Sequence, residues 1–420
     1  MPEFQSVRGF HDLFGEELKR FRYVSNLIRE KLRLYNFEEI ILPVVEYLEV
    51  FQRSIGEATD IVQKEMFAFQ DRKGRWLALR PEGTAGAVRA YVQNRLYVLK
   101  PYVKLFYEGP MFRYERPQAG RYRQFHQIGA EVFGSLDPHV DAEIIQLVYE
   151  ILSELKVEVI IEINSIGCKV CRPAYREALI NYLNTVEGGL CEVCLDRKDR
   201  NPLRVLDCKV PTCKEAVREA PKMVDFLCEE CSQHYSKLKE YLTVLSIPYR
   251  ENPNLVRGLD YYTKTVFEAV STDLDITVIA GGRYDYLVEE FGGPPTPAIG
   301  FAVGVERLSM LIKDLPPEEL KRKRLILHLK DMQVFMNRAD LEDVLYNLIG
   351  NAIRHSKSMV HIKICPKVGA LIIRNDVSHV ENSGMGLGFE LTKEVVKRYG
   401  FSLNVRIKKG YTVFLSFAKR

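Results

Sequence analysis

The sequence predicts an α+β protein made of three units, and three observations support this prediction. Helix and strand patterns are mixed over residues 1–165, and strand character returns over 246–312. Between these stretches, residues 166–245 combine helical patterns with eight of the nine cysteines, as expected of an inserted helical domain. Residues 313–324 are charged and contain a Pro-Pro pair, so we expect a linker there, followed by a third unit over 325–420.

Individual elements follow from periodicity and from proline. Apolar residues at helical spacing predict helices over 21–34 and 141–154, whereas residues 39–43 indicate a strand that ends at Pro43. Residues 157–163 indicate another strand. The third unit is predicted to run strand, helix, two strands, glycine-rich loop, helix and two strands.

Composition narrows the class of protein. Of the 420 residues, 46% are hydrophobic and 28% are charged, which is typical of a globular protein with a sizeable core. A net charge of +4 is compatible with a local nucleic-acid patch but does not by itself favour one. Residues 1–12 show no signal pattern, and no apolar run approaches the roughly 20 residues of a membrane helix, so we expect a cytoplasmic protein without a membrane partner.

The stretch from Phe112 to Gly134 carries the most chemical information. It is predicted as a strand, a basic loop and a return strand, with Arg113 and Glu115 on one face of the first strand. Phe125, Gln127 and Glu131 share one face of the return strand. A solvated hairpin with a charged loop would explain this pattern. So would a pocket, because arginine neutralises phosphate and carboxylates bind N–H groups.

This stretch resembles motif 2 of class II aminoacyl-tRNA synthetases in its histidyl-specific form. Residues 300–308 are similar to motif 3 of that class, and Pro43 with Glu46 falls where motif 1 places its dimer-interface proline. Residues 79–84, 255–263 and 280–285 resemble further segments of histidyl-tRNA synthetases. Together these motifs cover residues 1 to about 312, and the resemblance implies an antiparallel sheet flanked by helices.

The resemblance also implies an activity and the residues that perform it. The enzyme would join histidine to ATP as histidyl-adenylate, with Mg²⁺, and then transfer histidine to tRNA(His), acting as a homodimer. Arg113 and Arg257 would be catalytic, since two anions must meet and fixed positive charge is needed. The ATP-binding residues would be Arg113, Glu115, Arg121, Phe125 and Arg307. The histidine-binding residues would be Glu82, Thr84, Gln127, Glu131, Arg257, Tyr261, Tyr262 and Tyr284.

A second family shares this fold and remains an alternative. The regulatory subunit of ATP phosphoribosyltransferase resembles these synthetases and lacks their anticodon-binding domain, which is also not recognisable in this sequence. That family usually loses the segment around Arg257 and most of the inserted domain, and both are present here.

The clustered cysteines predict metal ligation. They form four close pairs: Cys168 with Cys171, Cys191 with Cys194, Cys208 with Cys213, and Cys228 with Cys231. Two such pairs complete a tetrahedral site of four sulfur atoms, so eight cysteines fit two structural zinc ions. An iron–sulfur centre uses the same ligand atoms, and eight reduced cysteines are the third possibility. Spacing does not determine which pairs combine.

The third unit resembles the ATPase domain of histidine kinases in a degenerate form. Asn347 and Asn351 lie at four-residue spacing in a predicted helix, and the glycines of a second glycine box follow at Gly384, Gly386 and Gly388. The first glycine box is reduced to residues 375–377. A second nucleotide site at these five residues is one expectation, and a structural or partner-binding module is the other.

Overall fold

The computed structural model describes residues 4–417 apart from 57, 58, 60, 118, 119, 275, 316–323, 329–333, 335, 337, 355–358, 376–386 and 408–410. Contacts divide the chain into two compact units, residues 1–29 with 37–313 and residues 30–36 with 314–420. Most of the predicted linker at 313–324 lies outside the described residues. Among the helices that are described, none has the length and apolar character needed to cross a membrane.

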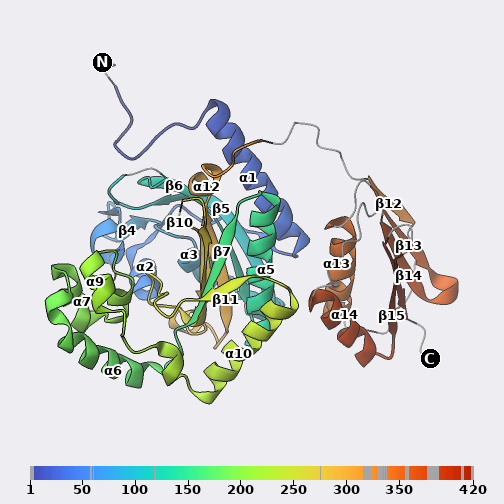
Figure 1. Ribbon diagram of the computed structural model, residues 1–420. Helices are drawn as coiled ribbons and strands as arrows, with labels where there is room; N and C mark the ends of the chain where they lie inside the picture. Colours follow the sequence, from blue (N-terminus) through green and yellow to red (C-terminus); the bar gives the residue numbers. More distant parts are fainter. Residues whose placement is uncertain are drawn as a thin grey trace. The chain divides into compact units, whose positions relative to one another are not determined.

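An eight-stranded sheet forms the centre of the first unit (Figure 1). Its six central strands are antiparallel, and a short parallel strand pairs at each edge. In spatial order the strands are β1 (Glu38–Glu39), β5 (Val103–Phe112), β6 (Gln124–Phe133), β11 (Ala298–Gly304), β10 (Ile276–Arg283), β9 (Thr263–Ser271), β7 (Val159–Ser165) and β8 (Tyr249–Glu251). The predicted antiparallel sheet is confirmed, although β1 is shorter than the strand expected over 39–43.

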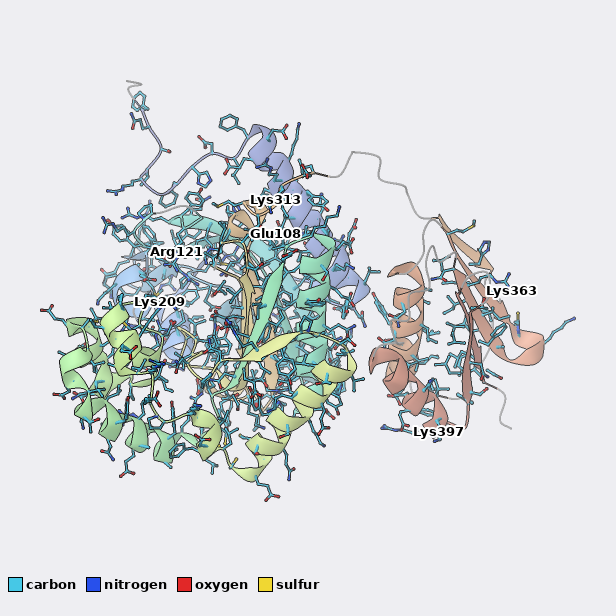
Figure 2. The ribbon with its side chains drawn as sticks, in the orientation of Figure 1. Glu108, Arg121, Lys209, Lys313, Lys363 and Lys397 are labelled. Atoms are coloured by element: carbon cyan, nitrogen blue, oxygen red, sulfur yellow. The ribbon has the colours of Figure 1, made fainter. Side chains whose placement is uncertain are left out.

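Helices pack against this sheet where their apolar stripes predict. Helix α5 (Pro138–Glu154) starts with Asp137 as its N-cap, whose carboxylate accepts the His139 amide at 3.0 Å, and its buried face contacts β9, β10 and β11. Helix α1 (Gly15–Leu34) is held to β5 by Glu108, which accepts hydrogen bonds from Ser25 at 2.7 Å and from Arg29 at 2.9 Å (Figure 2). The shorter helices of the unit are α3 (Thr84–Gln93), α4 (Leu96–Leu99), α11 (Leu287–Glu290) and α12 (Val305–Ser309).

A small antiparallel sheet lies beside α2 (Leu48–Ile55). Its order is β2 (Val45–Tyr47), β4 (Trp76–Leu79) and β3 (Ala68–Gln70). A π-helical turn follows α2 at Ile61–Glu65. Phe51, Ile55 and Ala78 are fully buried between this sheet and α2. Trp76, two residues before Ala78, lies on the same face of β4 but is 52% exposed.

The cysteine-rich insertion is helical, as predicted. It contains α6 (Arg172–Thr185), α7 (Glu192–Arg200), α8 (Leu203–Leu206), α9 (Pro211–Ala216) and α10 (Glu229–Val244). Helix α10 packs against α5, and the remaining insertion helices gather at one end of the unit (Figure 1). Six of the eight cysteines are buried and contribute to the hydrophobic core here. Such a thin core would gain stability from cross-linking.

The second unit is an α/β sandwich, as predicted. Two helices, α13 (Arg338–Arg354) and α14 (Leu387–Arg398), pack together and contribute to one core with the sheet. The sheet order is β12 (Arg324–His328), β13 (Met359–Cys365), β14 (Ala370–Asn375), β16 (Tyr411–Ser416) and β15 (Ser402–Ile407). Strands β12 and β13 are parallel, and the other pairs are antiparallel.

A buried ion pair joins α5 to the sheet. The Arg283 guanidinium reaches both Asp141 oxygens, at 2.6 and 3.1 Å, and neither side chain is exposed. His234 of α10 and Thr265 of β9 each contact Asp141 Oδ2 at 2.6 Å. Burial raises the pKa of Asp141, but Arg283 and His234 outweigh burial and lower it to about 2. The network therefore ties the insertion, α5 and two strands together.

Replacing Asp141 with alanine should destabilise the first unit by about 3–5 kcal/mol, because Arg283 would be left as an uncompensated buried charge. The midpoint of urea unfolding measures this loss, with Asp196→Ala, which breaks an exposed pair, as the control. The folded pKa of Asp141 lies below its unfolded value near 3.9, so its contribution is present above about pH 4 and is lost as the pH falls toward 2. Equal effects of the two substitutions would contradict the assignment.

Candidate functional site

A buried carboxylate lies at the centre of the large sheet. Glu131 on β6 is 1% exposed and accepts three hydroxyl hydrogen bonds: from Thr84 at 2.8 Å, from Tyr107 at 3.0 Å and from Tyr284 at 2.6 Å. The pKa of Glu131 is raised to about 8, because burial, with a smaller contribution from nearby Glu82, outweighs the three hydroxyls, which act to lower it. A buried carboxylate without a cation is a binding position for a cationic or N–H donor ligand.

Glycines make room for this arrangement. A Cβ on Gly300, which pairs with Glu131 across β11 and β6, would lie 1.8 Å from the Glu131 carboxylate. A Cβ on Gly129 would lie 2.2 Å from the Tyr107 ring, and one on Gly83 would lie 2.0 Å from it. These positions exclude any side chain because Tyr107 and Glu131 occupy the space.

The second acidic residue caps a helix. Glu82 is 4% exposed, and its carboxylate accepts the backbone amides of Thr84 at 2.6 Å and of Ala85 at 2.9 Å at the start of α3. Burial raises the pKa of Glu82, and these two amides act in the opposite direction. Its carboxylate therefore lies beside Glu131, where two acidic groups together favour a cationic ligand.

Aromatic residues and an amide complete this half of the site. Tyr261 contacts Tyr262 and Tyr284, with ring centroids 4.7 and 5.6 Å apart, and all three rings are buried. Gln127 Oε1 is buried and has no hydrogen-bond partner within the described part of the chain. A buried acceptor without a partner is costly, so it marks a position for a donor on a ligand.

The other half of the site is basic. Arg113 and Glu115 follow the end of β5 and lie in the loop, not in the strand where the sequence pattern placed them. Arg113 donates to the Pro81 carbonyl at 2.8 Å and lies over the Phe125 ring at 5.3 Å. Glu115 lies between Arg113 at 3.8 Å and Arg121 at 3.7 Å.

Two further arginines belong to the basic half of the site. Arg307 of α12 donates to the Thr277 carbonyl at 3.1 Å, and burial lowers its pKa, with the nearby positive charges of Arg121 and Arg113 adding to the effect. Arg257 is paired with Glu268 of β9, which also accepts from Thr277 at 2.6 Å. Burial acts to lower the pKa of Arg257, but Glu268 and Tyr262 outweigh it and raise the pKa. Each guanidinium is thus held in place before any anion binds.

Sequence reasoning missed two residues of this site. Tyr107 donates to Glu131 from β5, and a signal existed, since a large aromatic residue faces Gly129 across the strand pair. Glu268 holds Arg257, and its neighbour across β9 and β10 is Ala280. Arg257 lies in the loop before β9, and the path of that loop determines the contact, so no strand or helix pattern could have revealed it.

The acidic half and the basic half adjoin one another along β6 and β10. Phe125, Gln127 and Glu131 lie on one face of β6, so a single strand runs from the arginines to the buried carboxylate. Such a site holds a small ligand with a cationic or N–H group beside a polyphosphate. An antiparallel sheet of this order with this site defines the catalytic core of a class II aminoacyl-tRNA synthetase.

Comparison with known proteins identifies the family. A family model described as "Histidyl-tRNA synthetase" matches residues 9–308. The chain is 72% identical to the curated "Histidine--tRNA ligase" of Aquifex aeolicus over 320 residues, which is 76% of this chain and 79% of that relative. It is 52% identical to the protein of the same name from Thermodesulfovibrio yellowstonii over 324 residues, 75% of this chain and 77% of the other. The chain belongs to the histidyl-tRNA synthetase family.

Solved structures agree in fold. The crystal structure of apo Staphylococcus aureus histidyl-tRNA synthetase matches with a TM-score of 0.60 and 31% identity, covering 89% of this chain and 95% of that one. A Bacillus halodurans protein, titled as an ATP phosphoribosyltransferase regulatory subunit or histidyl-tRNA synthetase, matches with a TM-score of 0.54 at 22% identity. At that identity the match shows the fold alone.

The cysteines gather into two clusters of four. Cys168, Cys171, Cys228 and Cys231 form the first cluster, and Cys191, Cys194, Cys208 and Cys213 form the second. In the first, Cys168 Sγ lies 3.6 Å from Cys171 Sγ and 3.9 Å from Cys228 Sγ; in the second, the sulfurs of Cys191 and Cys208 lie 4.0 Å apart. A tetrahedral site with Zn–S bonds of about 2.3 Å places its sulfurs about 3.8 Å apart. Both clusters therefore fit a metal ion, and the first cysteine pair combines with the fourth.

The expected second nucleotide site is only partly within the described residues. Asn347 and Asn351 lie on α13, where Asn347 is exposed and Asn351 is half-buried. Gly388 is the second residue of α14, whereas Gly384 and Gly386 lie outside the described residues.

Replacing Glu131 with glutamine should change how stability depends on pH. The folded pKa of about 8 lies above the unfolded value near 4.3, so the wild type loses stability as the pH rises through this window, and the variant does not. From pH 5 to pH 9, the melting temperature of the variant should gain a few degrees relative to wild type, measured without ligands. Glu219→Gln, at an exposed position, is the control. If the difference in melting temperature between the variant and the wild type did not change with pH, Glu131 would not be a neutral acid near pH 6.

Proposed function

We propose that this chain is a histidine–tRNA ligase, which forms histidyl-adenylate from histidine and ATP and then transfers histidine to the 3′ end of tRNA(His). The observation that carries the proposal is the buried Glu131 carboxylate, which has three hydroxyl donors but no cationic partner among the described residues. Its strand, β6, also carries Phe125, which lies beside Arg113 in the basic half. Membership of the synthetase family and the intact segment around Arg257 support it.

The histidine side chain would occupy the acidic half of the site. Glu131 would accept an imidazole N–H, and Gln127, whose buried Oε1 has no partner among the described residues, would accept a donor from the substrate. Glu82 and Thr84 at the start of α3 would bind the amino group, with Tyr261, Tyr262 and Tyr284 enclosing the ring. Specificity would follow because a substrate without the N–H would add no donor to the buried Glu131 carboxylate, which would then keep only its three hydroxyl partners.

ATP would occupy the basic half of the site, with Mg²⁺. Phe125 would stack on adenine, and Glu115 would accept the adenine amino group after exchanging its present contacts with Arg113 and Arg121. Arg113 and Arg257 would bind the α-phosphate from two sides, and Arg307 would bind the γ-phosphate. The carboxylate of histidine attacks the α-phosphorus and pyrophosphate leaves, so these guanidiniums stabilise charge on the transferring group.

We propose a homodimer as the working state. Motif 1 residues Pro43 and Glu46 adjoin the small sheet, whose outer side exposes apolar side chains that a partner subunit would cover. They are Val45, Tyr47 and Phe69, which share the face of β4 that carries Leu77 and Leu79. For the second unit we propose two alternatives. It either is a module that binds a partner or holds a weak nucleotide site at Asn347, Asn351, Gly384, Gly386 and Gly388.

Replacing Arg257 with alanine should slow histidine-dependent ATP–pyrophosphate exchange by about 10²-fold or more, which corresponds to about 2.7 kcal/mol of transition-state stabilisation. Arg218→Ala, on the exposed surface of the insertion, is the matched control and should leave the exchange rate unchanged. A wild-type protein that lacks exchange but activates an ATP phosphoribosyltransferase would favour the regulatory-subunit alternative instead.

The two cysteine clusters should bind close to two zinc ions per chain. Elemental analysis of protein purified without added metal measures the stoichiometry, and visible absorption distinguishes zinc, which is colourless, from an iron–sulfur centre. Cys228→Ser should reduce the content to about one. Wild-type protein with no bound metal and nine titratable thiols, eight from the clusters and one from Cys365, would contradict both sites.

A further inference from the structure

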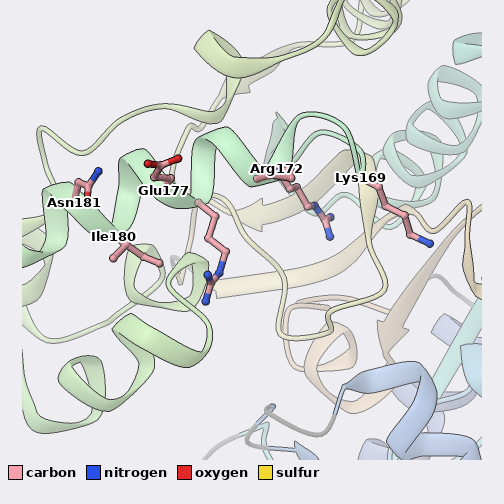
Figure 3. A pocket seen from close by; sticks show the side chains of 7 residues that line it. Lys169, Arg172, Glu177, Ile180 and Asn181 are labelled. Carbon is pink, nitrogen blue, oxygen red and sulfur yellow. The ribbon is translucent and has the colours of Figure 1, made fainter.

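The first cysteine cluster lies next to the chain segment that carries Tyr262. Cys171 immediately precedes α6, and Arg172 is the first residue of that helix. Figure 3 shows Arg172 and Lys169 extending from the start of α6, on the wall of an open groove. The Lys169 ammonium lies 4.0 Å from the ring centroid of Tyr286. The residues that line the groove belong to the insertion, but Lys169 and Arg172 extend toward residues that adjoin the catalytic sheet.

Arg172 makes the direct connection to the histidine pocket. Its Nη2 donates to the backbone carbonyl of Tyr262, and its Nε donates to the Ile166 carbonyl at 3.2 Å. The guanidinium thereby connects Ile166, at the start of the insertion, with Tyr262, which follows the insertion in the sequence. Hydrogen bonds from a charged donor are stronger than those between neutral groups, so this bridge restricts the backbone of Tyr262.

Three further hydrogen bonds hold the same segment to the same cluster. Lys264 exchanges backbone hydrogen bonds with the segment before Cys168: its amide donates to the Gly167 carbonyl at 2.8 Å, and its carbonyl accepts the Ile166 amide at 2.8 Å. The Lys264 ammonium donates at 2.6 Å to Glu230, which lies between Cys228 and Cys231. Both halves of the cluster are therefore attached to residues 262–264.

Tyr262 has little freedom on its other side. Its ring packs close to β10, where a Cβ added to Gly282 would lie 2.9 Å from Tyr262 Cδ1. It also contacts Tyr261, which in turn contacts Tyr284, the donor to Glu131. A shift of the Tyr262 backbone would consequently be transmitted to the tyrosines that enclose the substrate position.

We propose that Arg172 is a positioning residue that couples the first cysteine cluster to the histidine pocket. When the cluster holds its metal ion, the start of α6 is fixed and Arg172 keeps Tyr262 in the arrangement that binds histidine. The cluster then sets the affinity for histidine as well as the stability of the insertion. This inference rests on the proposed function, since it concerns the same pocket.

Three variants test the role of Arg172. Arg172→Ala should raise the Kd for histidine, measured by equilibrium dialysis with radiolabelled histidine, about tenfold, which corresponds to about 1.4 kcal/mol. It should raise the KM for histidine in the exchange reaction similarly, while the KM for ATP and the zinc content stay within twofold of wild type. Arg172→Lys, which keeps one donor, should restore part of the affinity. Arg176→Ala is the matched control, because Arg176 lies one turn further along α6 and donates to the Asp199 carbonyl on the exposed side.

The link to the metal requires a second comparison. Cys228→Ser should also raise the Kd for histidine, and the double variant with Arg172→Ala should bind histidine no more weakly than the weaker single variant, because both changes release the same segment. Fully additive effects would contradict coupling through Arg172.

The outcomes separate this inference from the proposed function. A wild type that does not bind histidine at millimolar concentration contradicts the proposed function itself, and this inference with it. A wild type that binds histidine, together with a folded Arg172→Ala protein whose Kd is within twofold of wild type, overturns the positioning role alone. Equal losses of histidine and ATP affinity in Arg172→Ala would also overturn it, since they would indicate a general loss of structure.

Discussion

The Glu131 carboxylate is the constraint on which the rest of the first unit depends. It is 1% exposed in the middle of a sheet and has no cationic partner in the part of the chain that the structure describes, and its hydrogen bonds come from three hydroxyl groups. Those hydroxyls reach it from β5, from the start of α3 and from the segment after β10. Bringing three such segments together requires glycine at Gly129 and Gly300, where a Cβ would collide with Tyr107 or with the carboxylate. The strand order of the sheet and the glycines of its central strands are thus both needed to place the three hydroxyls around Glu131.

The basic half of the site differs from the acidic half in how its charged groups are held. Its arginines do not share one partner: Arg113 is bound to the Pro81 carbonyl, Arg257 to Glu268, and Arg307 to the Thr277 carbonyl. Each is therefore oriented before a polyphosphate arrives, which limits the reorganisation needed during reaction. Arg283, which is paired with Asp141, immediately precedes Tyr284 and fixes the start of that segment. Stability and substrate binding therefore depend on neighbouring residues.

Much of this could be predicted from the sequence, for reasons that differ between regions. Glu131, Gln127 and Phe125 were predictable because alternation along one strand puts them on one face. The insertion was predictable because cysteines cluster within it. Arg113 and Glu115 were expected on a strand, but β5 ends at Phe112 and both lie in the following loop. Tyr107 and Glu268 were missed because their contacts depend on tertiary structure. Tyr107 reaches Glu131 across the β5–β6 pair, and Arg257 reaches Glu268 from the loop before β9. The combination of cysteine pairs, first with fourth and second with third, required the fold of the whole insertion.

The central claim is that the site selects histidine through a buried carboxylate and activates it with ATP. The most direct measurement is ATP–pyrophosphate exchange by the full-length protein, with each of the twenty standard amino acids supplied separately. Histidine should support exchange at a rate at least about 10²-fold above any other amino acid, because its imidazole combines an N–H donor for Glu131 with a ring that the surrounding tyrosines would enclose. Exchange at comparable rates with several amino acids, or none with histidine, would contradict the account.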